Sequence, residues 1–309
     1  MNNTIFISLA SYCDDMLEFT LKSAFNSAKN KENIFFGVVD QNHVNSRDTI
    51  KSLEFSNQIR YCHIFPDDSL GVSWARHLCF SLYNNEEYFL QVDSHTYFEE
   101  NWDENLIIQY KTLLGKSSKP IISTYPYGFS IEENNEITFK KPSGKYILVL
   151  RPKSEQILTT EDLVLRFKAE HVLSNEAILG CHIAAGFLFA KGSFIEEIPY
   201  DPYLYFHGEE QSLAIRSYTK GWDIYHPTWI PLYHLYKKSG TKYDSHHWSG
   251  DISKQRDFEW TYLQKRAKER IKKLINGELN HSIYGLGNVR TIKQYIDFSK
   301  IDYFNLTFK

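Results

Sequence analysis

The sequence of 309 residues predicts an α/β fold with a mainly parallel central sheet and helices on both faces. Two observations lead to this prediction. Short apolar runs rich in β-branched residues alternate with segments whose apolar residues recur at helical spacing. The predicted elements follow each other with short loops, as they do where strand, helix and parallel strand succeed one another.

Each predicted strand is a nearly continuous apolar run, which is typical of a strand buried on both faces. The first reads TIFISL, the second IFFGVV and the fourth YFLQV. The runs cover residues 4–9, 34–39, 59–65, 88–92, 120–124 and 184–190, and two shorter ones cover 224–226 and 230–234.

The predicted helices carry apolar residues at intervals of three and four. We expect Asp14 and Asp15 to cap the first helix, which continues to Ala28. Further helices are expected at residues 71–83, 101–114, 208–219 and 253–276. The last has an apolar stripe of Trp260, Leu263, Ala267, Ile271 and Leu274 and a basic opposite face.

Composition excludes several classes of protein. The chain has 35 Lys and Arg against 38 Asp and Glu, so its net charge of -3 predicts no nucleic-acid partner. No apolar run approaches the roughly 20 residues of a membrane-spanning helix, and the first residues lack the pattern of a signal peptide. Four scattered cysteines predict free thiols rather than a disulfide framework. We therefore expect a cytoplasmic protein.

Side chains that follow the strands are the first candidates for a site, because open α/β sheets bind ligands at the carboxyl ends of their strands. Asp93, Ser94 and His95 follow the fourth strand directly, and Asp93 and His95 share one side of an extended chain. A carboxylate and an imidazole suit a borderline divalent ion such as Mn²⁺. The alternative is a capping aspartate beside an unrelated histidine.

A third metal ligand has to come from far along the chain. His234 follows a short apolar run, but spacing alone does not rank it above the other candidates, which are His182, His207, His226, His246 and His247. Glu209 and Glu210 open a helix, where acids also serve the helix dipole. Arg76 stands one turn into a helix and suits a phosphate, although a surface arginine beside a core Trp74 is the simpler interpretation.

Longer segments resemble a known family. In order along the chain they are IFISLASYCDD, FGVVDQ, GVSWARHLCFSLYNNEEYFLQVDSH, AAGFLFAKG, PYDPYLYFHGEEQSLAIRSYTKGWDIYHPT and YHLY. Together they resemble the GlcNAc-transferase family that includes the cytoplasmic hydroxyproline N-acetylglucosaminyltransferases. The resemblance covers most of residues 4–240. It implies a GT-A fold, a UDP-sugar donor, a divalent metal (Mn²⁺ or Mg²⁺) and retention of configuration, with D-x-H as a variant of the D-x-D motif.

The resemblance also implies roles for single residues. The metal ligands would be Asp93, His95 and His234. The nucleotide and the donor sugar would be bound by Ser8, Ala10, Tyr12, Asp40, Trp74, Arg76, Asp93, Ser94, Ala185 and Gly186. The catalytic carboxylates would be Asp93, Glu209 and Glu210, the last two facing the acceptor and the sugar hydroxyls rather than acting as nucleophiles. Further aromatic residues expected around the sugars are Tyr203, Tyr205, Phe206, Trp222 and Tyr236.

The chain departs from the family pattern at Cys13, where arginine is frequent, and at Ser73, where cysteine is frequent. The first departure concerns the phosphate contacts, and we expect the second to matter little. We expect residues 1–250 to form the GT-A catalytic domain, with residues 132–178 as an irregular insert or acceptor-side segment. Residues 251–309 would form a C-terminal helical extension.

The predicted activity is metal-dependent transfer of a sugar, GlcNAc by family default, from a UDP-sugar to a hydroxyl of a protein, glycan or lipid-linked glycan. Two alternatives remain open, a UDP-sugar hydrolase and a non-catalytic sugar- or nucleotide-binding module. The basic helix at 253–276 adds peripheral contact with the inner face of the membrane as a further hypothesis, less favoured than a solvated helix face.

Overall fold

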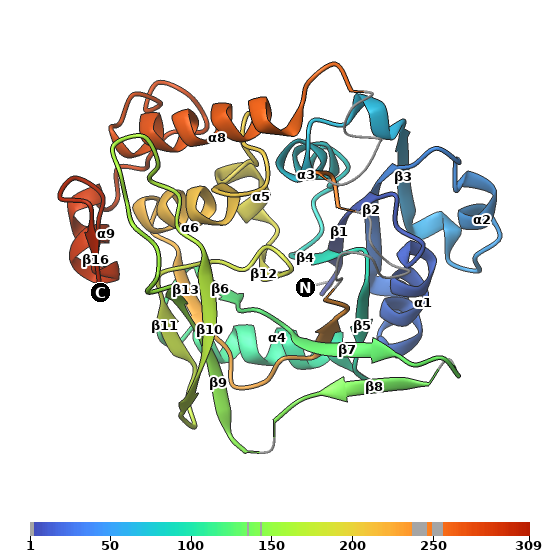
Figure 1. The fold of residues 1–309 in the computed structure, drawn as a ribbon. Coiled ribbons are helices and arrows are strands. Elements are labelled where there is room, and N and C mark those ends of the chain that lie inside the picture. Colours follow the sequence, from blue (N-terminus) through green and yellow to red (C-terminus); the bar gives the residue numbers. More distant parts are fainter. Residues whose placement is uncertain (1–2, 135, 143, 237–245, 249–255) are drawn as a thin grey trace.

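A central sheet of eight strands organises the molecule (Figure 1). The computed structural model describes residues 3–134, 136–142, 144–236, 246–248 and 256–309. In spatial order the strands are β11 (Ile178–Gly180), β13 (Asp223–His226), β6 (Pro120–Ser123), β12 (Phe187–Lys191), β4 (Tyr88–Asp93), β1 (Ile5–Tyr12), β2 (Ile34–Gln41) and β3 (Ile59–Ile64).

Parallel pairs join β3 to β2, β2 to β1, β1 to β4 and β13 to β6. The sheet is mixed, because β12 runs antiparallel to both of its neighbours and β11 runs antiparallel to β13. The carboxyl ends of β1, β2 and β4 therefore meet at one edge of the sheet, where the site was expected.

Helices cover both faces of the sheet, and alternation along β1 shows why. Ile5 and Ile7 pack on the side of α1 (Leu17–Ser27) and α4 (Trp102–Leu113). Phe6 points to the opposite side, toward α3 (Val72–Phe80), α5 (Ser193–Glu197) and α6 (Glu209–Thr219). Because the strand is apolar at both odd and even positions, it is buried on both faces, as predicted. A short helix α2 (Arg47–Lys51) and the 3₁₀ turns Lys31–Asn33, Ser56–Gln58 and Pro66–Asp68 lie in the connections.

A second, four-stranded sheet lies beside the carboxyl ends of the central strands. Its order is β5 (Thr96–Phe98), β14 (Leu232–His234), β7 (Tyr127–Ile131) and β8 (Ile137–Lys140). Strands β9 (Tyr146–Pro152) and β10 (Phe167–Leu173) form a separate hairpin. The described part of residues 132–178, expected to be an irregular insert or acceptor-side segment, thus contains β8, β9, β10 and the first residue of β11. The strand predicted at 230–234 forms in this second sheet.

The C-terminal segment packs against the rest of the chain. Helix α8 (Trp260–Ile275) begins later than predicted, and residues 253–255 of the predicted helix lie outside the described residues, as does the predicted boundary at 250. Leu263, Ala267 and Ile271 are fully buried, whereas Trp260 is 38% exposed and does not belong to the buried stripe. Helix α9 (Ile292–Ser299) and the short strands β15 (Ile301–Asp302) and β16 (Thr307–Phe308) follow.

Three of the basic side chains of α8 make contacts within the protein. Lys268 pairs with Asp162, Arg270 pairs with Asp201, and Arg266 donates to the carbonyl of Tyr203. Membrane contact through this helix stays a prediction. In the described part of the chain, no helix combines the length and apolarity needed to cross a bilayer.

Candidate functional site

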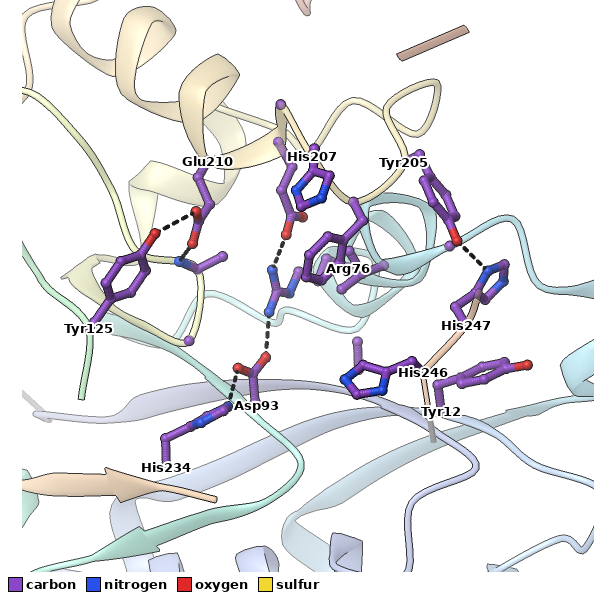
Figure 2. Close-up of a pocket in the computed structure, with 18 of the residues that line it drawn as sticks. Tyr12, Arg76, Asp93, Tyr125, Tyr205, His207, Glu210, His234, His246 and His247 are labelled. Carbon is purple, nitrogen blue, oxygen red and sulfur yellow. Dashed lines mark hydrogen bonds and ion pairs between the residues drawn. The ribbon is translucent and has the colours of Figure 1, made fainter. Parts of the chain in front are cut away.

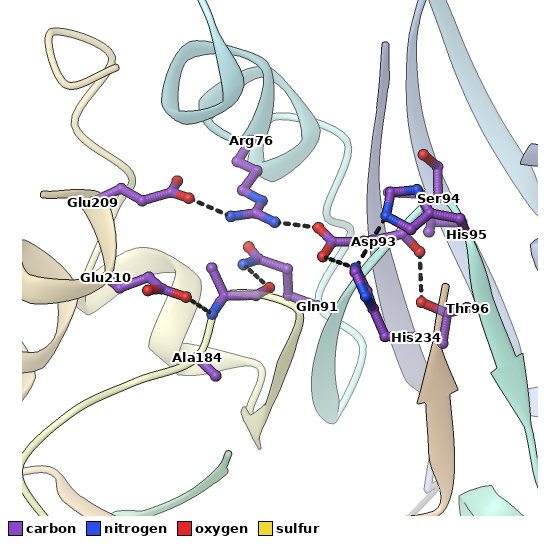
Figure 3. A network of polar contacts seen from close by, with 12 residues as sticks. Arg76, Gln91, Asp93, Ser94, His95, Thr96, Ala184, Glu209, Glu210 and His234 are labelled. Atoms are coloured by element: carbon purple, nitrogen blue, oxygen red, sulfur yellow. Dashed lines mark hydrogen bonds and ion pairs between the residues drawn. The ribbon is translucent and has the colours of Figure 1, made fainter. Parts of the chain in front are cut away.

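Two strands of different sheets bring a carboxylate and two imidazoles together (Figure 3). Asp93 ends β4, His95 lies two residues further on, and His234 ends β14. The distance from Asp93 Oδ2 to His234 Nε2 is 3.0 Å, and the Nε2 atoms of His95 and His234 are also 3.0 Å apart. One ligand atom from each of the three residues falls within 4.8 Å of the others. His234 is thus the histidine that the fold places beside Asp93 and His95.

Asp14 orients one of these imidazoles. Its Oδ2 atom lies 2.7 Å from His95 Nδ1 and accepts a 2.5 Å hydrogen bond from Ser94 Oγ, while its Oδ1 accepts from the backbone N–H of Met16. With Nδ1 turned to a carboxylate, the Nε2 of His95 faces His234 and Asp93. Asp14 was expected to cap the first helix, and its contact with His95 was not predicted because it depends on how the loop after β1 folds.

The three side chains fit a divalent cation. One carboxylate oxygen and two imidazole nitrogens are a donor set suited to Mn²⁺ and similar borderline ions. A carboxylate behind a ligating imidazole is the usual supporting contact in such sites. All three residues are partly exposed, so solvent has access to a cation that they would hold.

Arg76 joins this centre to the acids of α6. Its side chain is buried, with Nη2 2.7 Å from Asp93 Oδ1 and Nη1 2.7 Å from Glu209 Oε1. Burial raises the pKa of Asp93, but the hydrogen bond to His234 and the charge of Arg76 outweigh it and hold that pKa well below 3.8. Arg76 is therefore not the surface arginine of the simpler interpretation. In this structure its guanidinium contacts carboxylates.

The two acids at the start of α6 have different surroundings. Burial raises the pKa of Glu209 from 4.5 to about 7, although the charge of Arg76 opposes the shift. Ser73, expected to matter little, donates to Glu209 Oε2 at 3.2 Å. Glu210 accepts from the backbone N–H of Ala185 at 2.7 Å and from the hydroxyl of Tyr125 at 3.3 Å. Its Oε2 lies 3.7 Å from Nε2 of His182.

These groups line one cavity of about 490 Å³, within the usual size range of a small-molecule site (Figure 2). One end of it is aromatic. The rings of Tyr12 and His247 are 4.9 Å apart, and the hydroxyl of Tyr205 lies 2.9 Å from His247 Nδ1. Arg256, from the C-terminal segment, hydrogen-bonds the hydroxyl of Tyr12 and the carbonyl of His247. Burial raises the pKa of Tyr12 to about 12, so its hydroxyl remains protonated at neutral pH.

The structure brings most of the predicted site residues to this cavity. Those that line it are Ala10, Tyr12, Arg76, Asp93, Ser94, His95, Ala185, Gly186, Glu209, Glu210 and His234. Small size matters at Gly186, because a Cβ there would stand 2.8 Å from Asp93 Oδ2. Asp14 and Tyr125 also line the cavity, and their positions were not predicted. Two further lining residues had been candidates: Gln41 follows the second strand, and His247 was a rival for the third metal ligand.

Three predicted donor-binding residues are not among the lining residues. Ser8 is fully buried within β1, and Trp74 packs beside the small cluster of Val39, Ala75 and Cys79. Asp40 is buried and accepts hydrogen bonds from Ser46 and Tyr61. Their roles were implied by the resemblance to the family, and the similarity of a segment does not determine the direction of each side chain. Of the further aromatic residues, Tyr205, Phe206 and Tyr236 line the cavity, Tyr203 does not, and Trp222 is buried in the core.

The chain is similar to a described protein family and to several solved structures. Residues 4–56 and 45–305 match the family model described as Glycosyltransferase (GlcNAc). The solved structure of GalNAc-T7 with UDP, GalNAc and Mn²⁺ is similar with a TM-score of 0.62 at 14% identity, and the match covers 98% of this chain and 58% of that chain. Residues 1–349 of S. aureus TarS in complex with UDP-GlcNAc match with a TM-score of 0.47 at 11% identity, covering 96% of this chain and 79% of that one. No curated protein sequence matches.

Proposed function

The chain belongs to the glycosyltransferase (GlcNAc) family and has the GT-A fold, and from this premise we propose that it transfers a sugar from a UDP-sugar to a hydroxyl acceptor. GlcNAc is the sugar we propose, following the family. The acceptor would be a hydroxyl of a protein or glycan, and the configuration at the sugar would be retained. The identity of the donor and of the acceptor is proposed and not carried over from GalNAc-T7, because the match covers only 58% of that chain.

One observation carries the proposal. Asp93, His95 and His234 come together at the carboxyl edge of the central sheet, inside the cavity that also holds Arg76 and Glu209. GalNAc-T7, which shares the fold, was crystallised with UDP, GalNAc and Mn²⁺. We propose that the three residues hold Mn²⁺ or Mg²⁺. When bound, such an ion supplies positive charge beside the leaving diphosphate.

The remaining residues would bind and orient the substrates. The rings of Tyr12, Tyr205 and His247 offer flat apolar surfaces for a uracil base. Ala185 and Gly186 leave room beside Asp93 for the donor sugar. The buried Arg76 adds a fixed positive charge where negative charge develops as the glycosidic bond breaks.

Neither Glu209 nor Glu210 is assigned as a nucleophile. Glu209 pairs with Arg76 and accepts from Ser73, and Glu210 holds the backbone of Ala185. We propose instead that Glu210 orients acceptor or sugar hydroxyls and that the departing phosphate oxygen takes the acceptor proton. This route keeps attack and departure on one face of the sugar, which gives retention.

The reaction is proposed for the cytoplasm. The four cysteines, Cys13, Cys62, Cys79 and Cys181, are free thiols. Free thiols fit a reducing compartment.

Release of UDP tests the proposed function. We expect UDP to accumulate when the protein is mixed with UDP-GlcNAc, Mn²⁺ and a hydroxyl acceptor that takes up the sugar, and excess EDTA to stop its release. Asp93→Asn should lower the rate about 100-fold or more, because the substitution removes a charged ligand, while the exposed Asp48→Asn keeps the wild-type rate. Circular dichroism verifies that both variants fold.

Analysis of the products separates the alternatives. A transferase gives a glycosylated acceptor and a hydrolase gives only the free sugar. Full activity of Asp93→Asn, or in EDTA, would contradict the metal site. Binding of UDP without turnover of any UDP-sugar would leave a binding module instead.

A further inference from the structure

A second hollow opens beside the cavity of the site. This groove of about 610 Å³ shares Tyr125, Pro126 and Tyr236 with the cavity. The hydroxyl of Tyr236 donates to the carbonyl of Pro126 at 2.8 Å, and its ring is 4.4 Å from the ring of His234. Tyr236 therefore stands between the proposed metal ligands and the groove.

Tyr125 makes the second connection between the two hollows. It lines both, and its hydroxyl donates to Glu210 (Figure 2). A molecule lying in the groove would thus reach the site on the side of Glu210, the residue proposed to orient acceptor hydroxyls.

Residues of two hairpins, β7–β8 and β9–β10, line the groove; Figure 1 shows where these hairpins lie in the fold. From β7 and β8 come Tyr127, Gly128 and Lys140, and the alternation of β9 and β10 turns Leu148 and its partner His171 toward it. Gly128 lies opposite Lys140 in the β7–β8 pair. A Cβ at Gly128 would stand 3.4 Å from the ring of Tyr236 and 3.7 Å from Cδ of Lys140, so the missing side chain keeps the groove open there.

The charge of the groove is positive, although the chain as a whole carries -3. Lys140, Lys141 and His171 line it, and no carboxylate does so among the described lining residues. The Nζ atom of Lys141 lies 3.5 Å from Oε1 of Glu99 and 5.8 Å from the centre of the Tyr127 ring. Lys140 is exposed and has no ion-pair partner in the described part of the chain.

We propose that this groove binds an acceptor glycan that carries a negative group, a phosphate or a carboxylate, next to the hydroxyl that receives the sugar. The proposal rests on the proposed transferase function and names its acceptor class. The faces of Tyr125, Tyr127 and Tyr236 suit sugar rings, and Lys140 and Lys141 suit the anion. Continuity with Glu210 places such a chain on the acceptor side.

Equilibrium binding tests the proposal without a known acceptor. Calorimetry with UDP and Mn²⁺ present would compare neutral chitotetraose with a hyaluronan tetrasaccharide, which carries carboxylates, and with phosphorylated maltotetraose. At low ionic strength we expect at least one anionic oligosaccharide to bind about five- to tenfold more tightly than the neutral one. The advantage should shrink as salt is added. Which anionic probe binds better distinguishes a phosphate from a carboxylate.

Two groove variants and one control variant connect the preference for anionic sugars to the groove. Lys140→Glu should remove the anionic advantage, whereas Lys145→Glu should keep it, because Lys145 is an exposed lysine close in sequence that does not line the groove. Gly128→Val, which fills the floor, should weaken binding of the anionic probe at least fivefold. Equal binding of neutral and anionic probes, or equal effects of the two lysine variants, would overturn the proposal.

Two further measurements separate the possible failures. If hexaglutamate binds with the same affinity as the anionic sugar, the groove accepts an acidic peptide, and the proposal of a glycan acceptor is overturned. A wild-type protein that binds no UDP contradicts the proposed function itself. A protein that binds UDP and shows no preference for anionic sugars contradicts only the acceptor class.

Discussion

Asp14 shows how much one side chain outside the ligand set contributes to the candidate metal centre. It is 5% exposed and contacts both Ser94 and His95. An imidazole held at Nδ1 by a carboxylate keeps its ring orientation and is a stronger ligand through Nε2. The precision of the centre therefore depends on the loop between β1 and α1 as well as on β4.

Replacement of Asp14 tests this support. We expect Asp14→Asn to lower the affinity for Mn²⁺ about 10- to 100-fold, because the amide no longer supplies the charge behind His95. Calorimetric titration with Mn²⁺ measures the change directly and does not depend on turnover. The neighbouring Asp15→Asn is the matched control, since Asp15 is exposed. Unchanged Mn²⁺ affinity in Asp14→Asn would refute the orienting role.

At this scale the sequence predicted residues whose position follows from a strand end. Asp93 and His95 lie where β4 ends, and parallel strands bring such positions to one edge. It did not predict Asp14, whose contact depends on the backbone of a loop. Trp74 does not line the cavity although Arg76 does, because a helix turns neighbouring residues to different sides.

His226 links two elements that are distant in sequence. It ends β13, its Nδ1 is 2.8 Å from the carbonyl of Ser123 in β6, and its Nε2 is 3.3 Å from the backbone nitrogen of Leu150 in β9. These partners require a neutral ring that donates from Nδ1 and accepts at Nε2. Burial lowers the pKa of His226 from 6.5 to about 4.

A dependence of stability on pH follows. The unfolded chain binds a proton at His226 below pH 6.5, whereas the folded chain binds it only near pH 4. The contribution of His226 to the free energy of unfolding is therefore fully present above pH 6.5 and is lost as the pH falls toward 4. Between pH 7 and pH 5 the loss is about 2 kcal/mol. Urea unfolding at both values should show a smaller decrease for His226→Gln than for the wild type.

The exposed His43→Gln serves as the control for that measurement and should retain the wild-type decrease. Equal decreases in the wild type and in His226→Gln would contradict the prediction. Part of the decrease should persist in His226→Gln, because burial also lowers the pKa of His247, to about 3.

The elements predicted from the sequence are those with strong apolar patterns. The buried strands β1, β2, β4 and β6 are nearly continuous apolar runs, and the pattern locates them. The β7–β8 hairpin of the second sheet and the separate β9–β10 hairpin were not predicted, because β8 and β10 are largely exposed and their polar residues show no clear period. Pairing with a neighbouring strand, which depends on the whole fold, makes them strands.

Contacts between the start of α6 and α8 join the C-terminal segment to the rest of the molecule. Gly208 precedes Glu209 with a φ of +101°, and a Cβ there would stand 3.0 Å from Cγ1 of Ile271 in α8. The same hydrophobic cluster contains Ile271, Leu263, Tyr205 and Ile215. Helix α8 therefore supports the start of α6, where Glu209 and Glu210 lie. It also shares a hydrophobic core with Tyr205, which precedes α6 in the chain.

Removal of part of this shared core should destabilise the whole chain. Ile271→Ala should lower the free energy of unfolding by about 2–5 kcal/mol, because Ile271 is fully buried and its truncation leaves a cavity. Lys265→Ala, on the exposed side of the same helix, should stay within about 0.5 kcal/mol of the wild type. Urea denaturation measures both values. A loss below about 0.5 kcal/mol for Ile271→Ala would mean that α8 is dispensable for the core.

The bond between Arg256 and Tyr12 has a consequence for synthesis of the protein. Its two residues are 244 positions apart, and with His247 they close the aromatic end of the cavity. A growing polypeptide emerges from the ribosome with Tyr12 long before Arg256. The aromatic end of the cavity is therefore completed only after Arg256 has been synthesised, and a chain terminated before this residue lacks the contact that closes it.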